Sequence, residues 1–292
     1  MQEIGYEYSS IVARSPLKWP GAARLAFLVH LAIEHFEFNL PIPGGLGPDA
    51  GRFPDVRNYS LRDYGNRVGI WRIIKLFDKY NMKVDAVVNS SACDHYPILI
   101  EEGKKRDWEF VAHGITNSKS LTNLPEEEER RGIKQAIQRV ADAVGKRPEG
   151  WIGPNLGETF STRDILLEEG MRYVMDWCND DQPYLMKLRN GNLVAVPYSV
   201  DTNDLPAFNY YHLSPSEFYE RITDHFNVLY EEGATSGTVM GITLHPFVMG
   251  VPFRIKCLEK IFQYIVKHKD VWFTTPSEIV NWCYKHYFIV SK

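Results

Sequence analysis

WEFVAHGITNS, residues 108–118, contains the pattern that decides the fold class. A short apolar run, Phe110 to Ala112, is typical of a buried strand, and His113 and Gly114 end it. Barrels and doubly wound sheets place their catalytic groups at the carboxyl ends of parallel strands. We therefore predict a parallel α/β fold in which His113 stands at a strand end and faces a functional site.

The same pattern occurs at two other places in the chain. LAFLVHLAI, residues 25–33, leads directly into Glu34 and His35, and TVMGITL, residues 238–244, leads into His245. One carboxylate and several imidazoles at strand ends suit general acid–base catalysis or metal-assisted hydrolysis. For any one of these histidines, the alternative is a structural role in which the ring only holds a hydrogen bond.

The composition is that of an ordinary globular protein. The 292 residues are 44% hydrophobic and 24% charged, with a formal net charge of −4, and nothing indicates nucleic-acid binding. The four cysteines form no CxxC pair, which argues against a zinc ribbon and fits a reducing cytosol. Without a signal-like start or an apolar run of about 18 residues, we predict a cytoplasmic protein with no membrane partner. The expected partner is a small molecule, and homo-oligomerisation is left open.

Strand-like and helix-like segments alternate along the chain, which is typical of parallel α/β architecture. Apolar spacing predicts a helix over residues 64–80, and Ser214 with Glu217 predicts a capping box at a later helix. No linker or repeat interrupts the sequence, so residues 1–292 are expected to form a single catalytic barrel domain. The loop 38–57 is rich in Gly and Pro, and we expect it to act as a lid beside the first strand end.

Longer segments distributed over the chain are also distinctive. They are WPGAAR (19–24), DYGNRVGIWR (63–72), His113-Gly114, NDDQPY (179–184), VPYSVDTND (196–204), YEEGA (230–234) and Leu244-His245. These segments resemble the polysaccharide deacetylase superfamily, and within it the allantoinase-like branch of purine degradation. The resemblance implies an irregular (β/α) barrel of the polysaccharide deacetylase type. It would have about seven parallel strands, with the site at their carboxyl ends.

The resemblance also implies roles for the residues at the strand ends. The superfamily's metal-dependent members use an Asp-Asp pair and an HxxxH pair, which align here with Glu34-His35 and with His113 and Asn117. A bound zinc or nickel ion would then have His35, His113 and Asn117 as its ligands. The allantoinase-like branch works without a metal, and we expect that no cofactor is required here.

Substrate-binding residues are expected on the loops that follow other strands. They are Trp151, Pro154, Asn155, Asp176, Trp177, Asn203 and Asp204. The chain departs from the allantoinase-like pattern where a ureide would be gripped. It has Glu34-His35 instead of two glutamates, no arginine in the loop 151–159, and Pro246-Phe247-Val248 instead of an arginine. We therefore expect a substrate other than allantoin, namely a more apolar amide or cyclic imide.

Together these residues predict a hydrolase of non-peptide C–N bonds in a linear or cyclic amide, imide or ureide. Glu34 would activate water as the general base, and His245 would protonate the leaving nitrogen or stabilise the oxyanion. His113 and His35 would position the water. Two alternatives stay open: a metal-dependent N-deacetylase of an acetamido sugar, and a non-catalytic barrel that binds a small metabolite.

Overall fold

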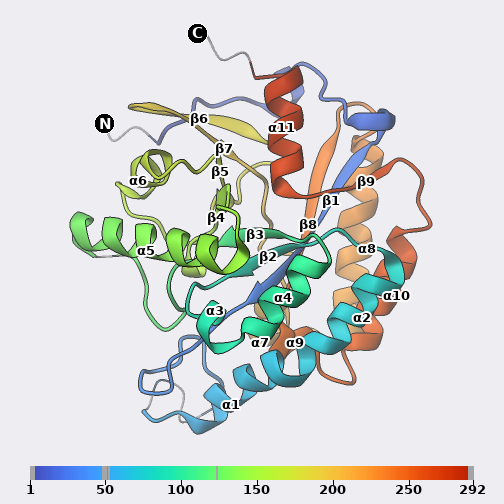
Figure 1. The fold of residues 1–292 in the computed structure, drawn as a ribbon. Coiled ribbons are helices and arrows are strands. Elements are labelled where there is room, and N and C mark those ends of the chain that lie inside the picture. The colour runs from blue at the N-terminus through green and yellow to red at the C-terminus, as the bar shows by residue number, and fades with distance from the viewer. Residues whose placement is uncertain (1–3, 48–50, 52, 123, 289–292) are drawn as a thin grey trace.

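The computed structural model describes residues 4–47, 51, 53–122 and 124–288. Within them, nine strands form one sheet in the order β6-β7-β5-β4-β3-β2-β1-β8, with β9 paired to β1. All neighbouring strands are parallel except those of the β6–β7 hairpin. The sheet curves into an open half-barrel, which confirms the predicted fold class (Figure 1). The hairpin is an addition that the sequence patterns do not predict.

The strands of the sheet are β1 (Leu25–Ile33), β2 (Asp85–Val88), β3 (Glu109–Ala112), β4 (Gly150–Trp151), β5 (Tyr173–Val174), β6 (Tyr184–Leu188), β7 (Gly191–Ala195), β8 (Thr238–Leu244) and β9 (Val271–Phe273). The helices are α1 (Val56–Tyr64), α2 (Ile70–Tyr80), α3 (Ala92–His95), α4 (Pro97–Lys105), α5 (Glu126–Val144), α6 (Thr162–Glu168), α7 (Asp204–Asn209), α8 (Pro215–Glu232), α9 (Pro246–Met249), α10 (Ile255–Ile265) and α11 (Pro276–His286). In the part of the chain that the structure describes, no helix is long and apolar enough to span a bilayer.

Strand β1 shows how the sheet builds a separate core on each face. All nine of its residues are buried, which is typical of a parallel strand that is covered on both sides. Ala26 and Leu28 belong to the apolar cluster in the barrel lumen, whereas Phe27 and Val29 pack against the outer helices. Because successive side chains point to opposite faces, the even-numbered residues of β1 point into the lumen.

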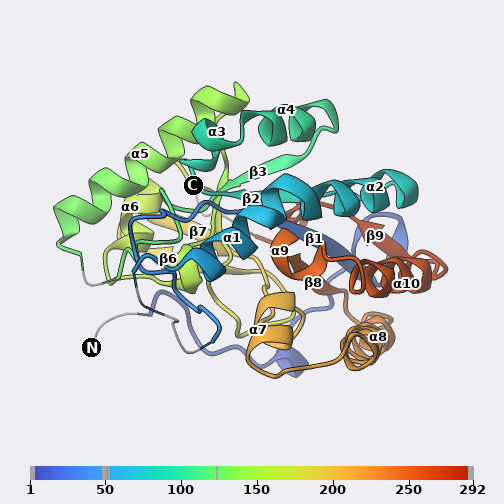
Figure 2. The same ribbon diagram turned by 90° about the horizontal axis from the view of Figure 1, so that it is seen from below.

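Helices cover the outer face of the sheet and one end of the barrel. α2, α4, α5, α8 and α10 lie in an arc around the strands (Figure 2). Ile279, Val280 and Cys283 of α11 join the lumen cluster at one end of the barrel. α1, α7 and α9 lie at the opposite end, near the carboxyl end of β1 (Figure 1). Because α11 fills the other end of the barrel, a site can form at the carboxyl ends of the strands.

The first helical segment differs from the sequence-based expectation. Apolar spacing predicts a helix over 64–80, but helical structure already begins at Val56 and passes through a π-helical turn before α2. The side chain of Asp55 caps this start by accepting a hydrogen bond from the amide of Asn58. α1 is largely polar, so apolar periodicity does not reveal it. The capping box predicted at Ser214 is confirmed.

The predicted lid, residues 38–57, is described only in part, since 48–50 and 52 lie outside the described residues. Its described part is tied to α1, because Arg62 donates a hydrogen bond of 2.9 Å to the carbonyl of Pro43. The role of this loop as a lid stays a prediction.

Candidate functional site

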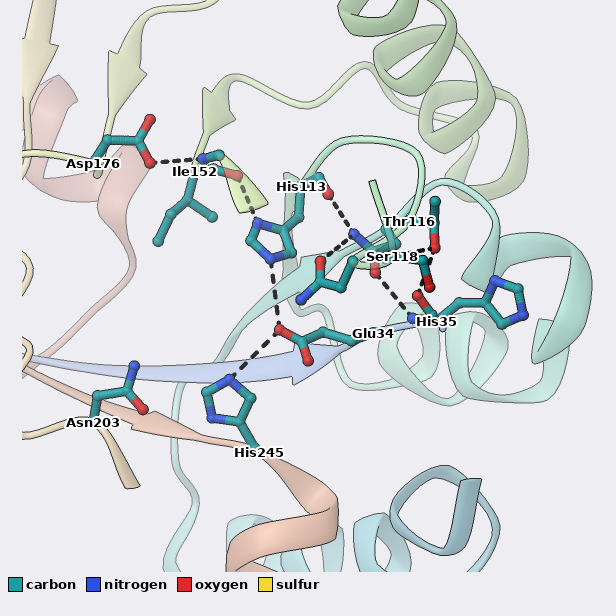
Figure 3. Close-up of polar contacts among 12 residues, drawn as sticks. Glu34, His35, His113, Thr116, Ser118, Ile152, Asp176, Asn203 and His245 are labelled. Atoms are coloured by element: carbon teal, nitrogen blue, oxygen red, sulfur yellow. Dashed lines mark hydrogen bonds and ion pairs between the residues drawn. The ribbon is translucent and has the colours of Figure 1, made fainter. Parts of the chain in front are cut away.

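Three strand ends bring Glu34, His113 and His245 together, as Figure 3 shows. Glu34 follows β1, His113 follows β3 and His245 follows β8. Oε1 of Glu34 lies 3.6 Å from Nε2 of His113 and 3.5 Å from Nε2 of His245. The side chains are nearly buried, with 9%, 6% and 5% of Glu34, His113 and His245 exposed. The chain thus forms a compact cluster of one carboxylate and two imidazoles.

The register of each strand explains why these side chains meet. Glu34 continues the lumen-facing series of Leu28, and His113 lies two residues after Val111, which also faces the lumen. His245 occupies the matching parity at the end of β8. Because side chains alternate along a strand, all three extend into the same barrel mouth.

A backbone hydrogen bond orients the ring of His113. Its Nδ1 donates to the carbonyl of Ile152 at 2.6 Å, so Nε2 is the nitrogen that faces Glu34. Gly114 follows with a φ of 65°, and a Cβ there would lie 2.8 Å from Pro154. This close approach favours glycine and places the loop after β4 directly beside the histidine.

Asp204 orients the second histidine. Its Oδ1 accepts a hydrogen bond from Nδ1 of His245 at 2.7 Å, and its Oδ2 accepts one from the backbone N–H of His245 at 2.8 Å. The carboxylate is fully buried at the start of α7. The prediction that Asp204 contacts substrate is therefore corrected, because both of its oxygens hold His245 in place.

These ionised groups change one another's pKa. Burial alone would raise the pKa of Glu34, but the charge of His245 and the close approach of both histidine rings hold it well below its usual range. Burial alone would lower the pKa of His245, but Glu34 and Asp204 raise it to about 10. At neutral pH the site therefore contains a carboxylate at Glu34 and an imidazolium at His245.

Asp204→Asn is expected to move the alkaline limit of activity to lower pH. The substitution removes one of two anions that raise the pKa of His245. In the unmodified chain His245 loses its proton as the pH rises through about 10, and in the variant this occurs at lower pH. Protonation of His245 also stabilises the fold. This contribution to the free energy of unfolding is fully present below about pH 6.5 and is lost as the pH rises through about 10. A pH profile of kcat/KM measures the shift, and an unmoved alkaline limb would contradict the role of Asp204.

The structure separates the side chains of the expected metal-ligand set. His35 continues the outward-facing positions of β1, and Figure 3 shows its ring pointing away from Glu34 and His113. Its Nδ1 donates to Oγ of Ser91 at 3.0 Å, and its ring stacks on His95 with 3.9 Å between the centroids. Burial and the neighbouring His95 lower the pKa of His35 to about 4. His35 is therefore placed away from the cluster that it was expected to join.

Asn117 is engaged by a different residue. Its Oδ1 accepts a hydrogen bond from Nδ2 of Asn89 at 2.9 Å, and its backbone N–H donates to the carbonyl of His35. Among the residues that the structure describes, no group of three or more His, Cys, Asp or Glu side chains could hold a metal ion. The expected set of His35, His113 and Asn117 does not fit a bound zinc or nickel ion in this arrangement.

Several residues that were predicted to contact substrate are buried or bound to other parts of the chain. Trp151 is fully buried in the cluster between the sheet and its outer helices, so its prediction as a substrate contact is wrong. Asn203 caps α7, and its side chain accepts a hydrogen bond from the amide of Leu205 at 2.9 Å. Pro154 is buried and Asn155 is exposed. Contact of substrate with Asn203, Pro154 or Asn155 stays a prediction.

Asp176 and Trp177 lie behind the His113 side of the site. Oδ1 of Asp176 accepts a hydrogen bond of 2.7 Å from the amide of Gly153, next to the carbonyl that holds His113 (Figure 3). Burial and the nearby Glu158 raise the pKa of Asp176 well above its usual range. Trp177 donates to Glu158 at 3.0 Å. In these contacts the pair supports the loop after β4, and its binding of substrate stays a prediction.

Asn89 has no part in the sequence-based prediction, yet it joins three strand ends. Its Oδ1 accepts from the amide of His35 at 2.9 Å, and its Nδ2 donates to Asn117 and to the carbonyl of His113. The available signal is its position, because it is the first polar residue after the apolar residues 86–88. An amide at a strand end can join neighbouring loops because it donates and accepts.

Comparison with known proteins shows what this half-barrel is similar to. The polysaccharide deacetylase family model matches residues 59–174. The peptidoglycan deacetylase of Helicobacter pylori is 24% identical over 273 residues, which cover 82% of this chain and 92% of that protein. The structure of a probable polysaccharide deacetylase from Pseudomonas aeruginosa PAO1 has a TM-score of 0.83 and 29% identity, over 96% of this chain and 98% of that one. These matches support membership of the polysaccharide deacetylase superfamily.

Another solved structure, Puue allantoinase, is similar over 97% of this chain and 100% of its own. Its TM-score is 0.84 and its identity 28%, which gives weak support to the allantoinase-like branch. The segment matched by the polysaccharide deacetylase model contains His113 and Asn117, whereas Glu34 and His245 lie outside it. The roles of Glu34 and His245 therefore depend on the geometry of the site.

Proposed function

We propose that this chain hydrolyses a non-peptide C–N bond in a small linear or cyclic amide, imide or ureide. The observation that carries the proposal is the buried Glu34 carboxylate placed between the Nε2 atoms of His113 and His245. The similarity to deacetylases and to Puue allantoinase supports a hydrolase of C–N bonds. An amide nitrogen is a poor leaving group, so its hydrolysis benefits from both a base and an acid.

The three side chains can divide the reaction between them. Glu34 removes a proton from a water molecule whose oxygen attacks the carbonyl carbon of the substrate. His113, whose Nδ1 donates to the carbonyl of Ile152, directs Nε2 to the same space beside Glu34, where it orients this water. The His245 imidazolium then donates its proton to the leaving nitrogen as the C–N bond breaks. The products are a carboxylic acid and an amine or amide, and the two side chains exchange protons with solvent to complete the cycle.

The low pKa of Glu34 in the site without substrate makes the carboxylate a weak base. A base works best when its pKa lies near the working pH. A substrate carbonyl oxygen that accepts a hydrogen bond from His245 draws that proton away from Glu34. The weaker attraction then lets the pKa of Glu34 rise, so the carboxylate becomes a stronger base once substrate is bound.

We propose that the reaction requires no metal. The supporting observation is the direction of His35 and Asn117, whose polar atoms bind Ser91 and Asn89 instead of meeting at His113. A metal-dependent N-deacetylase of an acetamido sugar remains compatible with the family, and it would require these side chains to turn toward His113. Zinc or nickel would then be held by His35, His113 and Asn117.

The function is tested by one screen on the purified chain, prepared without chelators. Cyclic imides, ureides, linear amides and N-acetyl sugars are offered as substrates, and the metal content of the same sample is measured by elemental analysis. We expect hydrolysis of an amide, imide or ureide without stoichiometric metal. Deacetylation of N-acetyl sugars with one equivalent of zinc or nickel would favour the alternative. Saturable binding without any turnover would indicate the non-catalytic barrel.

A further inference from the structure

A buried arginine lies against two aromatic side chains that follow the proposed base and acid. Arg62, in the last turn of α1, is 6% exposed. Its guanidinium carbon lies 4.9 Å from the ring centre of Phe36 and 5.0 Å from that of Phe247. Phe36 is two residues after Glu34, and Phe247 is two residues after His245. The guanidinium therefore lies between the segments that carry the proposed base and the proposed acid.

The described surroundings of Arg62 hold the guanidinium through uncharged acceptors and form no ion pair with it. Its terminal nitrogens donate to the carbonyls of Asn58, Pro43 and Gly44 at 3.2, 2.9 and 3.3 Å. These acceptors are uncharged, and among the described residues no carboxylate lies within ion-pair distance of Arg62. Its Nε is buried and has no hydrogen-bond partner in the described part of the chain. One donor of this charged group is therefore unused among the described residues.

A buried cation without a direct ion-pair partner is energetically costly, and an anion placed beside it reduces that cost. Burial lowers the pKa of Arg62, while the carboxylates of Glu34 and Asp55 act in the opposite direction. Arginine also pairs with carboxylates through charge-assisted hydrogen bonds and stacks on aromatic rings, as it does here. The missing partner that best matches the unused donor is a carboxylate.

We propose that Arg62 is a specificity residue that binds a carboxylate on the substrate, so that the preferred substrate is an anionic amide or imide. This inference rests on the proposed function, since it assigns a substrate class to the same site. It adds a charged group to the apolar amide expected from the sequence. The stacking on Phe36 and Phe247 keeps the guanidinium at a constant position relative to Glu34 and His245, so the carboxylate would orient the scissile bond.

Binding of a matched ligand pair tests the proposal without requiring turnover. Hydantoin and 5-carboxymethylhydantoin, which differ by one carboxylate arm, are titrated calorimetrically into the unmodified chain and into Arg62→Met. We expect the unmodified chain to bind the carboxylate compound about tenfold more tightly or better, and Arg62→Met to lose that preference. Arg62→Gln keeps amide donors for the carbonyls of Pro43 and Gly44 and is expected to lose the preference as well.

Arg67→Met is the matched control, because Arg67 lies one turn further on and 73% of its side chain is exposed. It should keep the preference for the carboxylate compound. Equal loss of affinity for both ligands in the Arg62 variants would show that Arg62 only holds the 43–44 loop, which overturns the proposal. Equal affinities in the unmodified chain, or no binding of the carboxylate compound, would also overturn it. If both ligands bind with the expected preference but neither is hydrolysed, the proposed function fails for this ring class while the role of Arg62 stands.

Discussion

Glu34→Gln is expected to lower kcat by about 10² to 10⁴ while the chain stays folded. Glutamine preserves the size of the side chain between His113 and His245, but its amide does not remove a proton from water. The measurement is turnover of the substrate identified in the screen, together with circular dichroism and thermal melting to confirm folding. Glu34 has the largest expected effect because no other carboxylate lies within ion-pair distance of both imidazoles among the described residues.

Glu37→Gln is the control for this substitution. It makes the same chemical change three residues away. The carboxylate of Glu37 pairs with Lys119 at 3.1 Å. We expect it to retain nearly full activity, because Glu37 contacts neither His113 nor His245. A folded Glu34→Gln protein with near-normal turnover would remove Glu34 from the mechanism.

His245→Ala is expected to lower kcat by about 10² to 10⁴ with a much smaller change in KM. The proton of His245 is needed when the C–N bond breaks, so its loss affects the transition state more than binding. The substitution also leaves Asp204 buried without its partner, and melting measurements are therefore part of the experiment. His286→Ala, an exposed histidine on α11, is the control and should be fully active.

Substrates with different leaving groups distinguish the possible roles of His245. An activated ester analogue has a leaving group that departs without protonation, so it should recover part of the activity of His245→Ala. The ratio of the losses on amide and ester is the quantity to compare. Equal losses on both substrates would exclude His245 as the acid and favour an oxyanion-stabilising or structural role.

The apolar runs before Glu34, His113 and His245 are sufficient to predict the location of the site. Each run is local in sequence, and parallel strands place their carboxyl ends at one edge of the sheet. Side-chain parity can also be read from the sequence, and it explains the direction of His35. His35 follows Glu34 directly, so the two side chains point to opposite faces.

Other features depend on contacts that no local pattern contains. Asp204 and His245 meet across 41 positions, and their pairing depends on how α7 lies against the end of β8. Arg62 stacks on Phe247 because α1 extends eight residues earlier than apolar spacing predicts and packs against α9. In both cases the partner of a charged group is decided by the packing of polar helices, which leaves little periodic signal.

The sequence by itself determined the parallel α/β class, the strand ends and the three residues of the central cluster. These follow from strand periodicity and from the common direction of parallel strands, which are properties of short segments. Only the tertiary structure decided that Asp204 orients His245, that His35 turns away, and that Arg62 stacks between Phe36 and Phe247. The reason is physical: hydrogen bonds and ion pairs act over a few ångströms, so their partners are set by the packing of distant segments.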